Sequence, residues 1–267
     1  MMILKLGFLS SFVLFLVSLS LGKPLVVAHR GASFEAPENT LPAFNLAWEQ
    51  GADAIEGDFL LTKDGHIVCI HDRTTKRFCD QDLVVAKSTL EQLKALDVGS
   101  WKNEKYADTR IPTISEVFAT VPEGKKIFVE VKCGVEIIPP LVKEIKESKL
   151  DHEQIILICF KAEVVKSFKE ILPYHKAFWL LGFKKDKKGA WNPSIESVLA
   201  KIKTSKADGL DSQHSIPEDF SKAMLDAGYE WHAWTINDVP TAKRMAKRGI
   251  YSITTDRPKL IASALSK

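Results

Sequence analysis

The chain has 267 residues, of which 45% are hydrophobic and 27% are charged, a balance typical of globular proteins. This composition excludes a disordered, collagen-like or low-complexity protein, and the length allows one large α/β domain or two small ones. The formal net charge of +3 is too small to indicate a nucleic-acid-binding surface, so we expect no nucleic-acid partner. The lysines within 184–188 surround an aspartate, a pattern typical of a solvated loop.

The N-terminus carries an uncharged apolar stretch that follows a single lysine, Lys5. This stretch is shorter than the roughly 20 residues of a comfortable membrane span. Ser20 and Gly22 are small residues at the positions that a signal peptidase requires for cleavage after Gly22. We therefore predict a secretory signal peptide over 1–22 and an exported mature chain, 23–267, periplasmic or secreted and without stable membrane insertion. An uncleaved membrane anchor is the alternative.

From residue 25 onwards, apolar runs of strand length alternate with segments of helical spacing. Lys63-Asp64-Gly65 separates the second and third strands, and Asp-Gly between apolar runs predicts a hairpin. Residues 73–112 are polar and irregular apart from one helical piece. In chain order, the predicted elements are strand 25–28, helix 38–50, strands 54–61 and 67–70, helices 89–96 and 115–120, strand 127–131, helix 136–148, strand 155–160, helix 162–171, strand 177–181, helix 194–203, strand 209–211, helix 217–227, strand 231–236, helix 240–248, strand 251–255 and helix 258–265.

This alternation favours a parallel sheet with helices outside it. When the hairpin is counted as one unit, the prediction holds eight strand–helix pairs within 23–267, which is the usual length of a (β/α)8 barrel. We therefore predict an α/β fold, a TIM barrel with a small insertion after the second strand unit, at about 73–112. A doubly wound open sheet is the alternative, although no GxGxxG or P-loop motif follows any strand.

Three acidic residues are predicted to meet at the carboxyl ends of the strands, where barrel enzymes carry their chemistry. Glu56 and Asp58 are two residues apart on one strand, so their side chains share a face, and Glu130 lies on the next core strand. Carboxylates aimed into a barrel are costly without a cation. Three oxygen donors and no thiolate favour one Ca²⁺ or Mg²⁺ ion over zinc. A structural salt bridge to Arg30 or Lys132 is the alternative.

Two histidines and two cations are predicted to flank these acids. His29 and His71 each end a strand, and histidine exchanges protons near neutral pH. Arg30 and Lys132 beside a metal site indicate an anionic substrate such as a phosphate ester, unless they serve only as counter-ions. The remaining histidines lack this setting and are predicted to be structural or on the surface, with a reservation for the last, which shares a strand face with Trp234: His66, His152, His175, His214 and His232.

The chain contains His29-Arg30, then Glu56-Gly57-Asp58, then His71-Asp72. In this order the motifs resemble the HR…ExD…HD signature of the glycerophosphodiester phosphodiesterase family. Further matches are Ala36-Pro37-Glu38-Asn39-Thr40, residues 93–101, Ile111-Pro112-Thr113, Glu130-Val131-Lys132, Trp234-Thr235-Ile236-Asn237 and Thr255-Asp256-Arg257-Pro258. The resemblance covers about 25–262, and such a long ordered series is specific.

The resemblance implies a metal-dependent barrel enzyme that hydrolyses glycerophosphodiesters to an alcohol and sn-glycerol 3-phosphate. It implies attack by the substrate's own glycerol hydroxyl, which gives a cyclic phosphate that water then opens. It also implies a supporting role for Glu38. Carried over position by position, the resemblance implies metal ligands at Glu56, Asp58 and Glu130, acid–base catalysis by His29 and His71, and substrate binding by Arg30, Lys132, Phe160 and Trp234.

Other functions remain open at this point. A lysophospholipase D-type or sphingomyelinase-type phosphodiesterase on a related barrel would need an apolar rim for acyl chains, for which Phe34, Phe59 and Phe183 are candidates. A silent phosphate-binding protein would not need both histidines and all three acids. A sugar hydrolase would need two carboxylates facing one bond and would not need the histidines.

Overall fold

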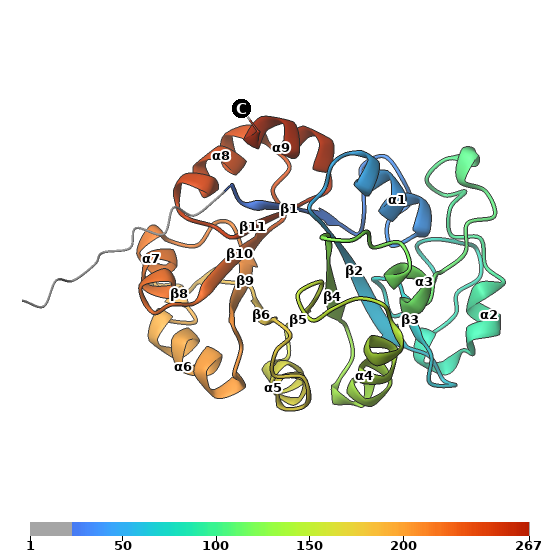
Figure 1. Cartoon of the computed structure of the whole chain (residues 1–267), viewed down its shortest axis with the longest axis horizontal. Coiled ribbons are helices and arrows are strands. Elements are labelled where there is room, and N and C mark those ends of the chain that lie inside the picture. The colour runs from blue at the N-terminus through green and yellow to red at the C-terminus, as the bar shows by residue number, and fades with distance from the viewer. Residues whose placement is uncertain (1–22, 267) are drawn as a thin grey trace, which may run out of the picture.

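A closed barrel of eight parallel strands forms the centre of the molecule (Figure 1). The computed structural model describes residues 23–266. Around the barrel the strands follow the order β1-β11-β10-β9-β6-β5-β4-β2, and β2 pairs with β1 to close the ring. The predicted TIM barrel is therefore confirmed, and the open sheet is excluded. The barrel strands are β1 (Leu25–His29), β2 (Ala54–Leu61), β4 (Lys126–Val131), β5 (Ile155–Cys159), β6 (Ala177–Leu181), β9 (Gly209–Gln213), β10 (Glu230–Trp234) and β11 (Ser252–Thr255).

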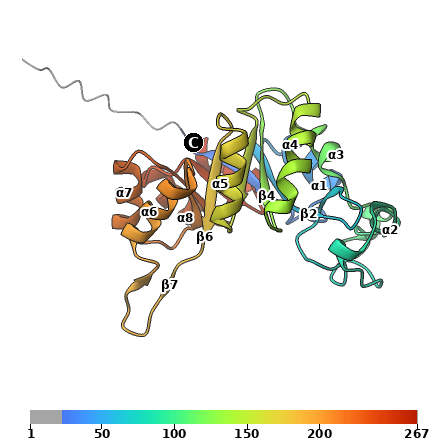
Figure 2. The ribbon, with the colours of Figure 1, turned by 90° about the horizontal axis from the view of Figure 1, so that it is seen from below.

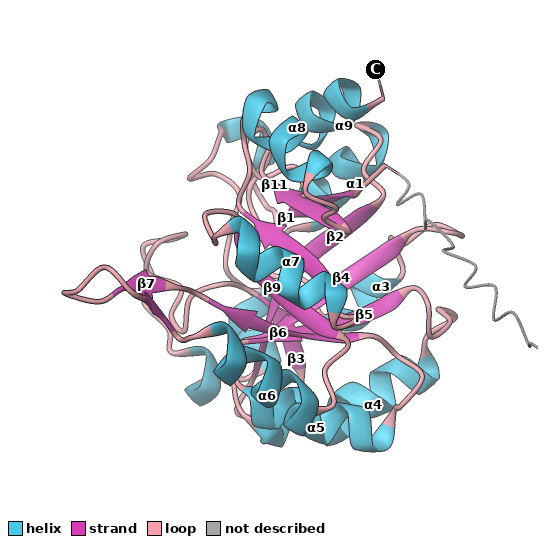
Figure 3. Cartoon of the chain, turned by 90° about the vertical axis from the view of Figure 1, so that its left-hand side faces the viewer, coloured by secondary structure: helices cyan, strands magenta, loops and turns pink. Residues whose placement is uncertain are grey.

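Helices surround the strands on the outside, as the colouring by secondary structure shows (Figure 3). Helix α1 begins later than the predicted 38–50 because Thr40 caps it, its side chain accepting from the Ala43 amide, and because Asn39 adopts a left-handed φ of 58°. The α-helices are α1 (Leu41–Glu49), α2 (Leu90–Lys94), α3 (Ile114–Phe118), α4 (Ile138–Glu147), α5 (Ala162–Ile171), α6 (Ile195–Ser205), α7 (Glu218–Asp226), α8 (Val239–Lys247) and α9 (Pro258–Leu265), with short 3₁₀ helices at Val85–Lys87, Glu104–Tyr106 and Val135–Ile137.

Two hairpins are added to this barrel. Strand β3 (Ile67–Cys69) pairs antiparallel with β2 as predicted, and the turn contains Gly65 at a φ of 82°. A second hairpin, β7 (Lys184–Lys185) with β8 (Trp191–Asn192), was not predicted and projects away from the barrel (Figure 2). Its strands are too short and too charged to give an alternating pattern.

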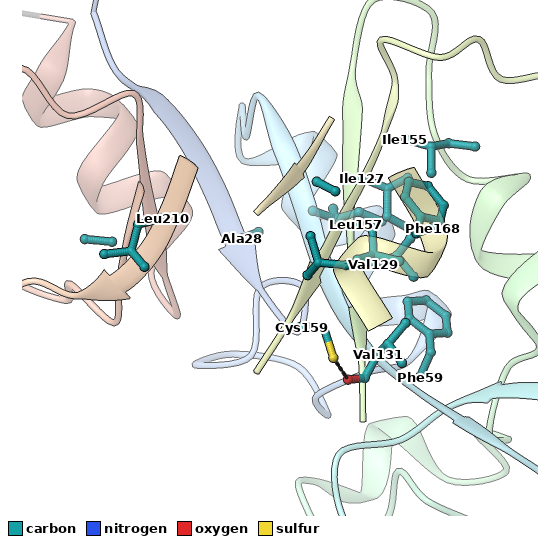
Figure 4. Close-up of a cluster of buried hydrophobic side chains, with 14 of the residues drawn as sticks. Ala28, Phe59, Ile127, Val129, Val131, Ile155, Leu157, Cys159, Phe168 and Leu210 are labelled. Atoms are coloured by element: carbon teal, nitrogen blue, oxygen red, sulfur yellow. Dashed lines mark hydrogen bonds between the residues drawn. The ribbon is translucent and has the colours of Figure 1, made fainter. Parts of the chain in front are cut away.

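The alternation of side chains along the strands separates an outer core from the barrel interior. On β4, Ile127, Val129 and Val131 face the helices, and they pack with residues such as Phe59 and Phe168 (Figure 4). The intervening residues point inward, where a separate apolar cluster fills the barrel. This inner cluster contains Val27, Ala54, Phe128, Ile156, Ile158, Phe178 and Leu180. Glu130 continues the inward-facing row of β4 beyond Phe128, which is why it reaches the mouth of the barrel.

His232 belongs to this filled interior. It is buried, its Nδ1 lies 2.7 Å from Ser252 Oγ, and its ring centroid lies 4.0 Å from that of Phe178. The structural interpretation of this histidine therefore agrees with its surroundings. Within 23–266, no helix combines the length and the apolar character needed to cross a membrane. The predicted signal peptide, 1–22, lies outside the described residues.

Candidate active site

The register of two strands brings the three predicted acids together. Asp58 on β2 pairs directly with Glu130 on β4, and Glu56 lies two residues before Asp58 on the same face. One carboxylate oxygen from each of the three lies within 4.8 Å of the others. Glu56 Oε1 is buried and accepts no hydrogen bond from any residue of 23–266, and buried Asp58 Oδ1 has only the Lys132 ammonium, 3.2 Å away. Three converging carboxylate oxygens, one of them without a donor, fit a divalent cation such as Ca²⁺ or Mg²⁺.

Burial, mutual repulsion and neighbouring cations give the three carboxyl groups different pKa values. Burial and the charges of Asp58 and Glu130 raise the pKa of Glu56 well above its usual value. Burial and Asp58 raise the pKa of Glu130 to about 7. Burial alone would also raise the pKa of Asp58, but Lys132 and Arg30 hold it below its usual value. Without a cation, the cluster therefore keeps one firmly ionised carboxylate beside two that tend to hold protons.

Arg30 and Lys132 contact these acids directly. Arg30 Nε lies 3.2 Å from Asp58 Oδ2, and the Arg30 backbone amide donates to Glu56 Oε2 at 2.9 Å. Lys132 Nζ lies 2.7 Å from Glu130 Oε1 and 3.2 Å from Asp58 Oδ1. Both cations therefore serve as counter-ions here, as the alternative interpretation allowed. Because both side chains also line the cavity, a role in binding an anion remains open to them.

His29 is held from behind by a carboxylate. Its Nδ1 lies 2.6 Å from Asp256 Oδ1, and Asp256 also accepts from Asn237 Nδ2 at 2.6 Å and from Ser33 Oγ at 3.2 Å. Burial would raise the pKa of Asp256, but the contacts with His29, Asn237 and Ser33 lower it, so the carboxylate stays ionised. An ionised carboxylate only accepts, so Nδ1 carries the proton and Nε2 is the nitrogen that can exchange one.

His71 has an equivalent partner in the next residue. Its Nδ1 lies 2.6 Å from Asp72 Oδ1, and Arg77 Nε donates to Asp72 Oδ2 at 2.8 Å. Arg77 continues to Glu38 through two bonds of 2.8 Å, and Glu38 accepts from Arg30 Nη1 at 2.8 Å. The hydrogen bond from Arg77 lowers the pKa of Asp72 to about 2. A continuous chain of charged contacts thus links the second histidine to the acidic cluster.

These groups surround a cavity of about 190 Å³ at the carboxyl ends of the strands. All of the predicted site residues except Asp58 line it, namely His29, Arg30, Glu56, His71, Glu130, Lys132, Phe160 and Trp234. Asp58 lies behind the lining, in contact with both cations. Two histidines, a cationic pair and a site for a divalent ion around one small cavity form a suitable arrangement for cleaving a phosphate ester.

The similarity to known proteins extends over nearly the whole chain. A model of the glycerophosphoryl diester phosphodiesterase family matches residues 29–260. The chain belongs to this family. A glycerophosphodiester phosphodiesterase of Caldanaerobacter subterraneus is 34% identical over 252 residues, which cover 92% of this chain and 99% of the relative. One from Bacillus subtilis is 27% identical over 282 residues, 97% of this chain and 94% of the relative.

A solved structure agrees with this membership. The structure of an Oleispira antarctica phosphodiesterase in complex with the product sn-glycerol-3-phosphate matches with a TM-score of 0.83 at 28% identity. The match covers 91% of this chain and 97% of that one. As a member of the family, the protein is an enzyme, a phosphoric diester hydrolase, as predicted.

The three phenylalanines that could have formed the apolar rim of a lysophospholipase D-type enzyme do not form one. Phe59 is fully buried because it alternates with Asp58 along β2 and so points to the helices. Phe183 is also buried and packs against Phe220, with ring centroids 5.8 Å apart. Phe34 is exposed, and the Arg257 guanidinium lies 3.7 Å from its ring centroid. The three phenylalanines therefore form no continuous surface for acyl chains.

An aromatic pair does border the cavity. Phe160 is about half exposed, and its ring lies edge-on to Trp234 with centroids 6.0 Å apart. The Phe160 carbonyl accepts from Trp179 Nε1 at 3.0 Å, which fixes the loop that follows β5. This pair forms the partly apolar wall that the family resemblance implied for Phe160 and Trp234.

Several residues of the site were not assigned a role from the sequence. Asn39 donates to Asp58 Oδ2 at 2.8 Å and accepts from the Asp58 amide at 3.1 Å, which fixes that carboxylate. Asp256 was named only within the Thr255-Asp256-Arg257-Pro258 match, which was the available signal. Arg77 lies in a polar segment without a pattern, and no spacing rule selects it. Asp211, on the short strand β9, lines the cavity.

Replacement of Asp256 by Asn should destabilise the His29 tautomer that carries its proton on Nδ1. The side chain at position 256 keeps its shape. Because Asn237 Nδ2 would hold the new amide oxygen, the amide NH₂ would face His29 Nδ1 and favour a proton on Nε2. We expect Asp256→Asn to lower turnover by at least about a hundredfold, as in other histidine–carboxylate pairs. Steady-state kinetics measure the turnover, and thermal melting checks that the variant is folded. Asp226→Asn, on an exposed site of α7, is the matched control. Unchanged turnover in Asp256→Asn would contradict the role of Asp256 in fixing the tautomer of His29.

Proposed function

We propose that the protein hydrolyses glycerophosphodiesters to an alcohol and sn-glycerol 3-phosphate, using one divalent cation, Ca²⁺ or Mg²⁺, held by Glu56, Asp58 and Glu130. The observation that carries this proposal is the convergence of three buried carboxylates, among which Glu56 Oε1 has no hydrogen-bond partner in the described residues, 23–266. The substrate class is supported by the Oleispira antarctica phosphodiesterase, which is described in complex with sn-glycerol-3-phosphate. The proposed partner is therefore a small molecule.

When bound, the cation supplies positive charge to the phosphate oxygens and lowers the pKa of a hydroxyl group that coordinates it. Arg30 and Lys132 place further positive charge beside the same three carboxylates. Their present partners, Asp58 and Glu130, are the carboxylates that would hold the cation. With those carboxylates neutralised, the guanidinium and ammonium groups become available to a phosphodiester. They would stabilise the charge that develops on its oxygens in the transition state.

His29 and His71 are proposed as the acid–base pair. Each presents Nε2 to the cavity because its Nδ1 binds a carboxylate, Asp256 or Asp72. One histidine removes the proton from the attacking glycerol hydroxyl, and the other protonates the oxygen of the departing alcohol. The cyclic phosphate formed in this step is then opened by water, with the two proton transfers reversed, to give sn-glycerol 3-phosphate.

Release of sn-glycerol 3-phosphate tests the reaction. We expect residues 23–267 to release it from at least one of glycerophosphocholine, glycerophosphoethanolamine and glycerophosphoinositol, with Ca²⁺ or Mg²⁺ but not with EDTA. Glu56→Gln, which resembles the protonated carboxyl, should lower the rate by at least about a hundredfold because a cation ligand is lost. Glu49→Gln, on the exposed side of α1, should not. Full activity in EDTA would refute the metal requirement.

Replacement of His71 separates proton transfer from metal binding. We expect His71→Ala to lower turnover by about 10²–10⁴-fold, the usual contribution of a general acid or base. Its affinity for Ca²⁺, measured by calorimetry, should stay close to that of the wild type because His71 contacts none of the three acids. His66→Ala is the control, since His66 is an exposed residue of the β2–β3 turn. Equal activity in His71→Ala would refute its role.

A glycerophosphodiester with p-nitrophenol as its leaving alcohol shows which histidine is the acid. Because p-nitrophenolate departs without a proton, the variant that lacks the acid should regain activity on this diester. The variant that lacks the base should remain slow on both kinds of substrate. Comparison of His29→Ala and His71→Ala on such a diester therefore assigns the two roles.

We propose that residues 1–22 are a secretory signal peptide and that 23–267 form the exported enzyme, with residues 73–112 inserted into the barrel. The uncharged apolar stretch after Lys5 and the small residues Ser20 and Gly22 support this. Strand β1 begins at Leu25, so cleavage after Gly22 would leave the barrel intact.

Processing of the full chain tests the export. We expect expression of residues 1–267 in a bacterial host to give an exported protein whose intact mass begins at Lys23. Replacement of Gly22 by Gln should leave the precursor uncleaved, because the peptidase needs a small residue there. A wild-type chain that keeps Met1 and sediments with membranes would instead indicate the uncleaved anchor.

A further inference from the structure

Asp211 is a buried carboxyl group in the cavity without a partner. Its side chain is 1% exposed and lines the cavity from strand β9. Its Oδ1 has no hydrogen-bond partner in the described part of the chain, 23–266. The other carboxyls of the cavity differ, since Glu130 has Lys132 at 2.7 Å and Glu56 accepts from the Arg30 amide at 2.9 Å. A buried carboxyl without a donor or cation is costly, so its presence needs an explanation.

The barrel places Asp211 opposite the acidic cluster. In the closed ring of strands, β9 is separated from β2 by the same number of strands in either direction. Glu56 and Asp58 therefore face β9 across the mouth. The groups suited to phosphate, Arg30 and Lys132, stand on the side of β1, β2 and β4. A substrate whose phosphate binds there extends a different part of itself toward Asp211.

Apolar residues and one histidine flank Asp211. It pairs in register with Leu180 of β6 and with His232 of β10, and Leu180, Ile158 and Trp234 line the same cavity. Burial, and secondly the charge of Glu130, raise the pKa of Asp211 well above its usual value. The burial of the group therefore favours its protonated form, and a protonated carboxyl can both donate and accept a hydrogen bond. A hydroxyl group has the same two capacities and is its natural complement.

We propose that Asp211 binds a hydroxyl group of the glycerol moiety and so selects glycerol-bearing phosphodiesters. This inference rests on the proposed function. It identifies glycerol as the part of the substrate that binds on the β9 side of the cavity, opposite the acidic cluster. Glycerol is the common portion of such substrates and is small enough, with its phosphate, for a cavity of about 190 Å³. The variable alcohol then leaves through the open side, beside the half-exposed Phe160.

A pair of ligands that differ only in hydroxyl groups tests the binding without any turnover. We expect the wild type, loaded with Ca²⁺, to bind sn-glycerol 3-phosphate at least about tenfold more tightly than propyl phosphate by calorimetry. Asp211→Ala should lose this preference while keeping its affinity for propyl phosphate. Asp211→Asn, whose amide also donates and accepts, should keep most of it. Equal preference in the wild type and Asp211→Ala would overturn the proposal, even if turnover itself were confirmed.

Kinetics on different head groups separate the glycerol from the leaving alcohol. Asp211→Ala should raise KM by a similar factor for the choline, ethanolamine and inositol diesters, because all three carry the same glycerol. If KM rose only for the choline and ethanolamine diesters, in both Asp211→Ala and Asp211→Asn, Asp211 would bind cationic head groups. That result would overturn the proposal.

Stability provides an independent readout. Because Asp211 is buried and its Oδ1 has no hydrogen-bond partner within 23–266, Asp211→Asn and Asp211→Ala should unfold at a temperature equal to or above that of the wild type. A clear loss of thermal stability in both variants would show that the carboxyl serves the fold, and would overturn the proposal.

Discussion

Burial of three carboxylates at one point is the constraint on which the rest of the cavity depends. Each buried ionised carboxylate is costly without a compensating charge, and repulsion between neighbours adds to the cost. The pairing of β2 with β4 nevertheless makes this arrangement unavoidable, because it sets Asp58 directly beside Glu130. Two effects reduce this cost. The pKa values of Glu56 and Glu130 are raised, which favours their neutral forms, and Arg30 and Lys132 compensate the charge of Asp58.

The same constraint explains why the loops around the cavity are so tightly connected. Arg30 neutralises Asp58, and it must itself be oriented, which Glu38 does from the loop before α1. Glu38 is in turn bound by Arg77 from the segment after β3, and Arg77 reaches Asp72 behind His71. Arg30 also adopts a left-handed φ of 56°, and its backbone amide donates to Glu56. Charge compensation and the orientation of His71, the proposed proton-transferring group, are therefore served by one network.

Sequence patterns predicted the parts of this molecule that follow from periodicity. Alternation of strands and helices was sufficient for the barrel, and the two-residue spacing of Glu56 and Asp58 placed both side chains on the inner face. Boundaries depend on local side-chain bonds, so the cap at Thr40 shortened the first helix by a few residues. Phe59, named only as a candidate for the rim of an alternative enzyme, is buried, and the same spacing rule accounts for this because its neighbour Asp58 faces the barrel interior. Partners across long sequence distances, such as His29 with Asp256, required the closed ring.

Arg77 and Asp211 show two different limits of such prediction. Arg77 lies in an irregular segment where no period constrains its direction, so its bonds to Glu38 and Asp72 are visible only after folding. Asp211 lies in a strand so short that the sequence does not establish which face it occupies.

Together these residues divide the cavity into a charged side and a nearly neutral side. The charged side suits the one portion of the substrate that always bears charge, the phosphate. The neutral wall, with Leu180 and Trp234 around a single carboxyl, can distinguish molecules only by shape and by one hydrogen bond. With Asp211 in its proposed role, such a cavity would recognise a phosphate ester through charge and its glycerol portion through a hydroxyl group. Specificity would then depend on β9, a strand outside the HR…ExD…HD motifs.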